Sequence, residues 1–580
     1  MTGQGIRQHE YQSGKSGRRQ SGCSACWIGV SSPVRPTTIL REPLKKAPSG
    51  PRMRSSESGW TLTSGTIARA DRSPSDLHAQ DLLLLQRPDE IFNEASQTVG
   101  DPLERDALGG EAELTGDRAI PRRLVVVSNR LGNIRDLLQA GGLAVGIGDA
   151  LAERGGLWLG ASAEYQDYAA SDEPLIRLER VGKIETAALT LPYEEYSLYY
   201  NGYANSTLWP LFHYRLDLVN HRAEFLHAYR QINARFAKAL AGLLSGNDDL
   251  VWVHDYHLIP LAAQLRRLGV RNRIGFFLHI PFPPPDLFVA TPDHEELIDD
   301  LLQYDVVGFQ TETDVGNFRR SVQAANSITF DINGSAEMNG RTVLSRCFPI
   351  GIDVDSIARM ANEAAEDVQI DSMRRQILGL KQIIGVDRLD YSKGLPGRME
   401  AFARLLERHP EHERAATYLQ IASPTREEVS AYADIRAQLE ATAGAVNGRY
   451  ADLAWTPIRY IHRAVSRSRL AGLLRASQVG LVTPLRDGMN LVAKEYIAAQ
   501  DEADPGVLIL SRFAGAAEEL AESLIVNPYA VDEVADAIAK ALAMPLEERI
   551  ARHSALLKRI RRNDAAEWRR SFLATLAGEN

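Results

Sequence analysis

The chain of 580 residues is poor in cysteine and has no long apolar run. Cys23 and Cys26 form one Cys-x-x-Cys motif, and Cys347 stands alone, so a zinc ribbon lacks its second cysteine pair. A disulfide framework is excluded as well, which favours a reducing compartment. No apolar stretch reaches the roughly 18–20 residues of a membrane span, and the N-terminus lacks the apolar core of a secretion signal. We therefore expect a cytoplasmic protein without a membrane partner.

The chain also lacks a strong charge of either sign. Its formal net charge of −9 argues against a general nucleic-acid binder, so we expect no nucleic-acid partner. A hydrophobic content of 44% and a charged content of 24% are ordinary for globular proteins. The length suggests several domains.

Residues 1–120 differ in composition from the rest of the chain. The first 70 or so are rich in Ser, Gly, Arg and Pro and have little apolar periodicity, and residues 71–117 are acidic. Such a composition predicts disorder. Three interpretations stay open: a regulatory arm, a targeting segment, or an upstream stretch from a misassigned start codon. We expect a disordered N-terminal extension over residues 1–120.

From Pro121 onwards, short apolar runs alternate with helical patterns in two successive series. The expected strands are Leu124–Val127, Leu250–Val253, Arg273–Leu278, Asp305–Phe309, Gln382–Val386, Tyr418–Ile421, Val479–Val482 and Val507–Leu510. We expect Phe348–Asp353 to be the last element of the first series, and two charged helices, Val531–Ala543 and Leu546–Thr575, to end the chain. Two βα series predict two Rossmann-like domains facing across a cleft, over residues 121–355 and 356–580.

The stretch from Val482 to Tyr496 combines a strand end, a polar turn and a helix start. Asp487, Gly488 and Asn490 lie in the turn. This arrangement directs free backbone N–H groups and the positive end of a helix dipole at an anion, and ligands of doubly wound domains bind at such turns. It predicts a phosphorylated or polyhydroxylated ligand. The alternative is an ordinary βα loop with a capping Asp.

Other polar residues also follow expected strands. Arg388 and Lys393 come directly after one strand and suit a pyrophosphate, although a solvated charge cluster is the alternative. His279 precedes a proline-rich loop that would hold it rigidly, and a core histidine is the alternative. A metal site at His254 and His257 is disfavoured, because the pair comes with a single carboxylate.

The first series contains a glycine pair and an aromatic cluster. Gly141-Gly142 allows close approach of a ligand to the backbone, but it is not a Gly-x-Gly-x-x-Gly motif, which disfavours a nicotinamide site. Residues 196–214 are dense in aromatic side chains, which suit sugars. A simple turn and a buried aromatic cluster are the respective alternatives.

Seven motifs in order give the chain a resemblance to a known family. They are Ser128-Asn129-Arg130, Gly141-Gly142-Leu143, the Leu208–His213 segment, His254-Asp255-Tyr256-His257, the His279–Pro283 segment, the Asp387–Gly394 segment and the Arg486–Tyr496 segment. Over about residues 121–575 the sequence resembles glycosyltransferase family 20, the trehalose-6-phosphate synthases, which are retaining enzymes of the GT-B fold. The resemblance implies an α/β protein of this type.

The resemblance also implies a reaction, which is transfer of glucose from UDP-glucose to glucose 6-phosphate. The products would be α,α-trehalose 6-phosphate and UDP. Front-face attack is implied, with the leaving phosphate as base, so we expect no protein nucleophile, no obligatory metal and no cofactor. The partners would be the two substrates, and we expect a homo-oligomer, a dimer or a tetramer.

Site residues follow from the resemblance position by position. Glucose 6-phosphate would be held by Arg130, Tyr200, Asp255 and Arg426. UDP-glucose would contact Gly141, Gly142, Arg388, Lys393, Asp487, Gly488, Met489, Asn490, Leu491, Val492 and Glu495. Trp209 and His279 would determine anomer selectivity, and the catalytic group would comprise Asp487, Arg388, Lys393 and His279.

Departures from the family pattern leave alternatives open. Val465 stands where an aromatic uridine contact is common, so the contact with the base is less defined. Because base contacts lie largely on backbone and variable loops, a donor with another nucleotide, ADP- or GDP-glucose, stays open. Another acceptor, such as glycerol 3-phosphate or a pseudo-sugar, is the nearest alternative. A phosphorylase with pyridoxal phosphate on Lys494 or Lys393, and a silent regulatory protein, are more distant alternatives. No phosphatase nucleophile motif is present in the sequence, so dephosphorylation of the product is not expected.

Overall fold

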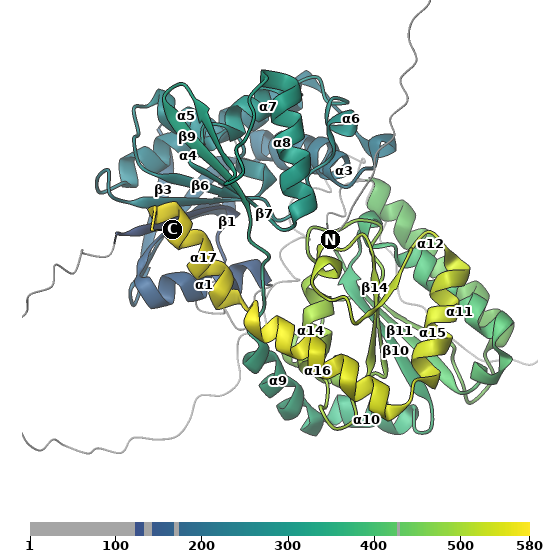
Figure 1. The fold of residues 1–580 in the computed structure, drawn as a ribbon. Helices are drawn as coiled ribbons and strands as arrows, with labels where there is room; N and C mark the ends of the chain where they lie inside the picture. The colour runs from purple at the N-terminus through teal and green to yellow at the C-terminus, as the bar shows by residue number, and fades with distance from the viewer. Residues whose placement is uncertain (1–121, 133–141, 167–172, 426–429, 580) are drawn as a thin grey trace, which may run out of the picture. The chain divides into compact units, whose positions relative to one another are not determined.

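The computed structural model describes residues 122–132, 142–166, 173–425 and 430–579. The predicted extension over residues 1–120 lies outside them. Within the described part, the strands pair into two sheets, one of nine strands and one of six (Figure 1). No helix in this part of the chain is both long and apolar enough to cross a bilayer.

The first sheet has the order β3-β4-β2-β1-β5-β6-β7-β9-β8. The strands are β1 (Leu124–Arg130), β2 (Gly156–Gln166), β3 (Leu175–Val181), β4 (Ile184–Pro192), β5 (Leu250–His254), β6 (Ile274–Phe277), β7 (Val306–Phe309), β8 (Ser335–Met338) and β9 (Arg341–Cys347). Only the two edge strands, β3 and β8, are antiparallel to their neighbours. The sequence order reverses between β1 and β5, which pair in parallel.

The second sheet is parallel throughout, with the order β12-β11-β10-β13-β14-β15. Its strands are β10 (Lys381–Arg388), β11 (Ala416–Ser423), β12 (Ile458–Ile461), β13 (Val479–Val482), β14 (Val507–Ser511) and β15 (Leu524–Val526). Numbered within the sheet, this is the Rossmann order 3-2-1-4-5-6. The order reverses between β10 and β13.

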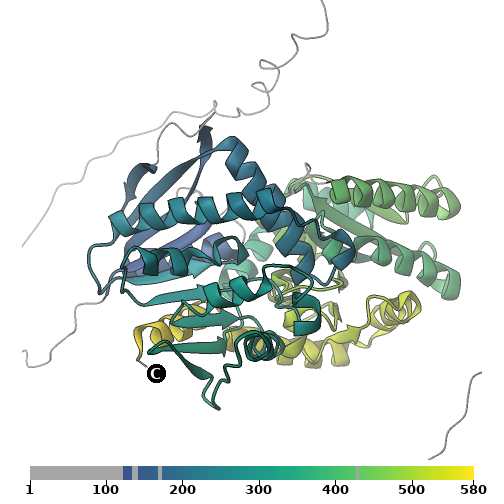
Figure 2. The same ribbon diagram turned by 90° about the horizontal axis from the view of Figure 1, so that it is seen from above.

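Helices cover both faces of each sheet (Figures 1 and 2). The helices between the strands of the first sheet are α1 (Gly142–Arg154), α2 (Tyr193–Ser197), α3 (Trp209–Phe212), α4 (Ala223–Leu243), α5 (Leu261–Arg267), α6 (Pro285–Phe288), α7 (His294–Leu301) and α8 (Glu312–Asn326). The later helices are α9 (Val354–Glu363), α10 (Val368–Gln376), α11 (Leu395–Arg408), α12 (Ser430–Tyr450), α13 (Arg467–Arg475), α14 (Leu491–Ala499), α15 (Val531–Ala543), α16 (Leu546–Arg562) and α17 (Ala565–Ala577). A π-helix, η2 (Leu198–Leu208), and short 3₁₀ turns complete the elements.

Continuous apolar strands follow from this two-sided cover. In β1, Val125 and Val127 pack into one core cluster with Phe236 of α4, whereas Leu124 and Val126 pack into the other cluster. All four side chains are at most 1% exposed. This explains why the first series showed unbroken apolar runs in place of an alternating pattern.

Two expectations about elements were wrong. Phe348–Asp353, expected to be the last element of the first series, forms neither a helix nor a strand. The last strand of the first sheet is β9, and Pro349 after it has no N–H to donate to a neighbouring strand. The expected helix Leu546–Thr575 is two helices, because Asp564 accepts a hydrogen bond from Glu567 N and begins α17 with its own cap.

Helix α17 packs on the first sheet and not on the second. Trp568 and Phe572 lie against Trp252 of β5, with ring centroids 5.0 and 4.8 Å apart. Figure 1 shows this yellow helix beside α1. The chain crosses between the sheets at Gly351 and at Asn563-Asp564, and a Cβ on Gly351 would lie 2.2 Å from the Asn563 carbonyl oxygen.

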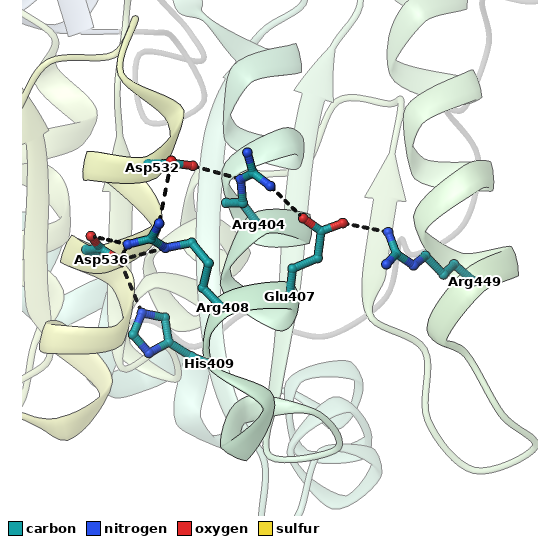
Figure 3. A network of polar contacts seen from close by, with 7 residues as sticks. All are labelled: Arg404, Glu407, Arg408, His409, Arg449, Asp532 and Asp536. Atoms are coloured by element: carbon teal, nitrogen blue, oxygen red, sulfur yellow. Dashed lines mark hydrogen bonds and ion pairs between the residues drawn. The ribbon is translucent and has the colours of Figure 1, made fainter.

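A network of exposed ion pairs connects α11 with α15 and α12 (Figure 3). Arg408 contacts Asp532 and Asp536, and Arg404 contacts Asp532 at 2.7 Å. Glu407 accepts from Arg404 and from Arg449 of α12. Because these side chains are largely solvated, we expect the network to contribute little to stability.

Candidate active site

The predicted site residues gather at the two points where the strand order reverses. Arg130 ends β1 and Asp255 follows β5, so both lie at the reversal of the first sheet. Arg388 ends β10, and Asp487 follows β13, at the reversal of the second sheet. In open α/β sheets, ligands bind outside the carboxyl ends of the strands at such points.

The predicted strand, turn and helix around Asp487 are confirmed. Strand β13 ends at Val482, and α14 begins at Leu491 with Asn490 as its N-cap. The Asn490 side chain accepts from Ala493 N at 3.4 Å and donates to Asp487 Oδ2 at 3.0 Å. Capping is therefore performed by Asn490, which leaves the Asp487 carboxylate to face other groups.

Lys393 and Asp487 meet across the reversal of the second sheet. Lys393 Nζ lies 2.5 Å from Asp487 Oδ2, and both side chains are nearly buried, at 10% and 13% exposed. Lys393 belongs to a 3₁₀ turn, η6 (Tyr391–Lys393), that follows β10. Among the described residues, the bonds to the Asp487 carboxylate fall on Oδ2, so Oδ1 is available to a ligand.

A buried ion pair supports both of these loops. Arg398 of α11 is paired with Asp387 of β10 at 2.5 Å, and the two side chains are 0% and 3% exposed. Arg398 also donates to Thr483 Oγ1, which follows β13, and to the Lys393 carbonyl oxygen. One guanidinium therefore links the ends of β10 and β13, a contact that the sequence did not reveal.

Arg130, one of the residues predicted to bind glucose 6-phosphate, is surrounded by tyrosine rings. Arg130 donates from Nε to the Tyr196 hydroxyl at 2.8 Å, and its Cζ lies 5.0 Å from the Tyr200 ring centroid. Tyr200 stacks on His257 at 5.6 Å and on Tyr196 at 5.3 Å. Burial raises the pKa of Tyr196 well above its usual value, against the opposing effect of Arg130, so this hydroxyl stays protonated. The buried aromatic cluster of the alternative interpretation is present here, and it surrounds the Arg130 guanidinium.

Asp255 has a strained backbone at the first reversal. Its φ of +77° is unusual for a residue other than glycine. Its backbone N–H donates to the Phe277 carbonyl oxygen at 2.8 Å, and its carboxylate accepts from His279 N at 3.2 Å. These bonds tie the loops after β5 and β6 together and hold the carboxylate in place.

Side chains from the two sheets meet at Trp209. Arg388, which is exposed, lies over the Trp209 ring with its Cζ 5.7 Å from the centroid. His213 packs on the same ring at 4.1 Å, and its Nδ1 lies 2.8 Å from the Trp209 carbonyl oxygen. Burial lowers the pKa of His213 to about 4, and Asp390, Lys393 and Asp487 are near enough to influence that pKa. His213 ends the Leu208–His213 motif, but no site role was predicted for it from the sequence.

Backbone contact also connects the two sets of loops. A Cβ on Gly488 would lie 2.2 Å from the His279 carbonyl oxygen, so only glycine fits there. A Cβ on Gly515 would lie 1.8 Å from the Gly488 carbonyl oxygen. Arg486 stacks on Tyr214 of the first half at 4.0 Å, which is a further contact that the sequence did not reveal.

The remaining predicted residues are distributed as follows. Met489 is buried, Leu491, Val492 and Glu495 are partly buried in the first turns of α14, and burial raises the pKa of Glu495. Gly142 begins α1. Gly141 and Arg426 lie outside the described residues.

A metal at His254 and His257 finds no support in the contacts of these residues. His254 Nδ1 is bonded to His279, and the His257 ring packs on Tyr200 and Tyr256. Across the described ranges, no group of three His, Cys, Asp or Glu side chains is placed to hold a metal ion.

Comparison with known proteins gives consistent relatives. The family model for glycosyltransferase family 20 matches residues 128–578. The trehalose-6-phosphate synthase of Enterobacter sp. (strain 638) is 49% identical over 455 residues, which are 78% of this chain and 95% of the relative.

Two solved structures are similar in fold as well as in sequence. An α,α-trehalose-phosphate synthase (UDP-forming) from Burkholderia xenovorans, in complex with glucose 6-phosphate, has a TM-score of 0.75 and 48% identity over 78% of this chain and 99% of that chain. The Escherichia coli enzyme bound with UDP-2-fluoro glucose has a TM-score of 0.74 and 47% identity, with the same coverage. The chain belongs to glycosyltransferase family 20, with the GT-B fold.

Proposed function

We propose that the chain transfers glucose from UDP-glucose to glucose 6-phosphate, with retention, and forms α,α-trehalose 6-phosphate and UDP. The observation that carries the proposal is the meeting of two strand-order reversals, one with an arginine in a tyrosine cluster and one with a Lys-Asp pair beside a helix N-terminus. The relatives with glucose 6-phosphate and with a UDP-glucose analogue support the choice of substrates.

On the acceptor side, Arg130 offers a guanidinium to the phosphate of glucose 6-phosphate. Arg130 NH2 lies 3.3 Å from the Tyr165 hydroxyl, and Arg130 is itself exposed, so a phosphate can approach it. Tyr200 supplies a ring edge to the sugar, and the Asp255 carboxylate accepts hydrogen bonds from its hydroxyl groups. Arg426, by its place in the family pattern, adds a second cation.

On the donor side, Arg388 and Lys393 neutralise the diphosphate as it leaves. The first-turn N–H groups of α14, at Leu491 and Val492, add the positive end of a helix dipole. Asp487 then holds a hydroxyl of the donor glucose through its available oxygen, and Glu495 accepts from the ribose. Gly141 and Gly142 approach the donor from the first half.

The reaction balances without a protein nucleophile. The bond from C1 of glucose to the UDP oxygen breaks, and the bond from C1 to the acceptor hydroxyl oxygen forms. The proton of that hydroxyl passes to the departing phosphate oxygen. The cationic groups stabilise the charge that develops on the diphosphate, which is a preorganised electrostatic task, and the acceptor residues hold the hydroxyl in position.

We also propose the domain division at residues 355 and 356, with α17 as a segment of the second half that packs on the first. The proposed acceptor residues other than Arg426 lie within residues 121–355, and the proposed donor residues other than Gly141 and Gly142 lie within residues 356–580. Trp209 and His279, proposed for anomer selectivity, lie where the halves touch.

Lys494, the first of the two lysines considered for pyridoxal phosphate in a phosphorylase, is not accessible to a cofactor in this structure. Lys494 is fully buried, donates to the Ile350 carbonyl oxygen at 2.7 Å and lies 2.6 Å from Glu519 Oε1. It therefore supports the crossing between the halves. Lys393 is engaged by Asp487.

Initial rates with matched donors and acceptors test the proposal. The full chain is incubated with UDP-, ADP- or GDP-glucose and with glucose 6-phosphate or glycerol 3-phosphate. We expect the highest kcat/KM with UDP-glucose and glucose 6-phosphate. Preference for glycerol 3-phosphate would replace the acceptor, and preference for another donor would replace the nucleotide.

A further inference from the structure

Two histidines at the ends of neighbouring strands share a hydrogen bond. His254 is the last residue of β5, and His279 follows β6 by two positions. His254 Nδ1 lies 3.1 Å from His279 Nε2, with the ring centroids 5.3 Å apart. His254 is completely buried, whereas His279 is partly exposed.

The contact between two ring nitrogens requires one proton and one lone pair. Burial lowers the pKa of His279 to about 3, and burial together with the neighbouring His279 lowers the pKa of His254 well below its usual value. Both rings are therefore neutral near pH 7, and each carries one N–H. Either His254 donates from Nδ1, or His279 donates from Nε2.

The surroundings of the other His254 nitrogen decide between these arrangements. Within the described part of the chain, His254 Nε2 and the indole nitrogens of Trp252 and Trp568 are buried without a hydrogen-bond partner. The Trp252 and Trp568 rings lie 4.5 and 6.3 Å from the His254 ring. If His254 Nε2 carried the proton, it would be a third buried N–H without a partner, beside the two indole N–H groups. If Nε2 carries the lone pair, it is instead a buried acceptor without a partner. Buried acceptors without a partner are more common in proteins than buried N–H groups without one.

We infer that His254 donates from Nδ1 to His279 Nε2 and is a positioning residue that fixes His279 as its Nδ1–H tautomer. His279 then offers an N–H donor, and not a lone pair, to a hydroxyl oxygen of the bound sugar. Which ring nitrogen carries the proton is set by the bond at the other nitrogen. The identity of the ligand as a sugar rests on the proposed function, but the tautomer does not.

The backbone around His279 makes the direction of this donor relevant to the site. The His279 carbonyl oxygen lies against Gly488, in the turn that holds Asp487. The His279 N–H is bonded to the Asp255 carboxylate at 3.2 Å. The main chain is thus fixed by residues of both sets of loops, and Nδ1 is the ring nitrogen that His254 leaves available.

Two substitutions separate the hydrogen bond from the volume of the side chain. His254→Asn retains an amide N–H near the position of Nδ1, whereas His254→Leu retains bulk and removes the donor. Trp252 and Trp568 are unchanged in both variants. Rescue by Asn is expected only if the donated hydrogen bond matters.

The test is a long-range ¹H–¹⁵N spectrum of the full chain labelled with ¹⁵N-histidine, with His279 assigned from a His279→Gln variant. We expect a protonated Nδ1 and a bare Nε2 on His279, unchanged from pH 8 to pH 5.5. The same tautomer is expected in His254→Asn and a mixture in His254→Leu. A protonated Nε2 on His279, or titration of His279 within this range, would overturn the inference, and the wild-type spectrum alone decides if the variants fail to fold.

Kinetics add a second readout. In His254→Leu we expect kcat/KM for UDP-glucose to fall about tenfold to a hundredfold, as for a lost hydrogen bond, and the KM for glucose 6-phosphate to stay within twofold. His254→Asn is expected to recover most of the loss. The expected tautomer without turnover of UDP-glucose would contradict the proposed function and leave the assignment of His254 standing.

Discussion

Single residues at the reversal of the second sheet have more than one partner. Lys393 and Asp487 neutralise each other in the structure, and each is also proposed to contact the donor. From the sequence, each of these two residues was predicted to lie in an anion-binding stretch, and the two stretches were considered separately. Their contact could not be read from the sequence, because 94 positions separate them and only the sheet order brings them together.

Removing the donor cations should reduce turnover and leave the fold intact. For Arg388→Ala and Lys393→Ala we expect kcat to fall by at least about a hundredfold, since each loses charge stabilisation of the leaving diphosphate. Arg130→Ala is the matched variant on the acceptor side, with a raised KM for glucose 6-phosphate. Steady-state kinetics and circular dichroism measure both effects, and wild-type rates would remove these residues from the site.

His213 should make stability depend on pH. The folded chain binds a proton at His213 only below about pH 4, but the unfolded chain binds it below about pH 6.5. As the pH falls through this interval, the free energy of unfolding drops by up to about 1.4 kcal/mol per unit. His213→Asn has no imidazole to titrate, so its free energy of unfolding should not fall in this way. In urea unfolding, the free energy of unfolding of the variant should therefore rise relative to that of the wild type as the pH is lowered from 6.5 to 5. A constant difference would contradict the pKa shift.

At the scale of elements, most strands of the two βα series could be predicted, because both sheet faces are covered and the strands are unbroken apolar runs. Strands β2, β3, β4 and β9 were missed, as were the short strands β8, β12 and β15. The edge strand β3 exposes Leu175 and Leu178, so it lacks a buried pattern. The π-helix η2 has no sequence signature, and it places Tyr200 beside Arg130.

Close packing of two loops should make Gly488 intolerant of a side chain. In Gly488→Ala, the added Cβ would press on the His279 carbonyl oxygen and separate the donor turn from the first half. We expect at least about a tenfold loss of kcat/KM, because small displacements of positioning groups have large effects on rate. Gly444→Ala in α12 is the control, since no atom lies within 4 Å of its Cβ. Equal rates in the two variants would contradict this packing account.

Ion pairs of the second half should differ in stability by their burial. Arg398→Met leaves Asp387 charged and buried, and we expect a loss of about 3–5 kcal/mol in the free energy of unfolding. Arg408→Met breaks the exposed contacts of Arg408 with Asp532 and Asp536 (Figure 3), and we expect a loss of at most about 1 kcal/mol. Chemical denaturation measures both, and a reversed order would show that burial does not decide their contributions.

For the whole molecule, the prediction of a GT-B enzyme of glycosyltransferase family 20 is confirmed. The Rossmann order of the second sheet explains why the motifs around Arg388 and Asp487, which are distant in sequence and proposed to bind the donor, lie at one edge. The packing of α17 on the first sheet could not be predicted, because an amphipathic pattern shows which face of a helix is buried but not against which element it packs. The homo-oligomer and the cytoplasmic location stay predictions.

The most direct measurement of the central claim follows the labelled anomeric carbon during turnover. The full chain is incubated with UDP-[1-¹³C]glucose and glucose 6-phosphate, and ¹³C and ³¹P spectra are recorded over time. The account predicts that the label moves to an α-configured carbon of α,α-trehalose 6-phosphate while UDP appears in equal amount. A β-configured product, free glucose alone, or no transfer to glucose 6-phosphate would contradict it.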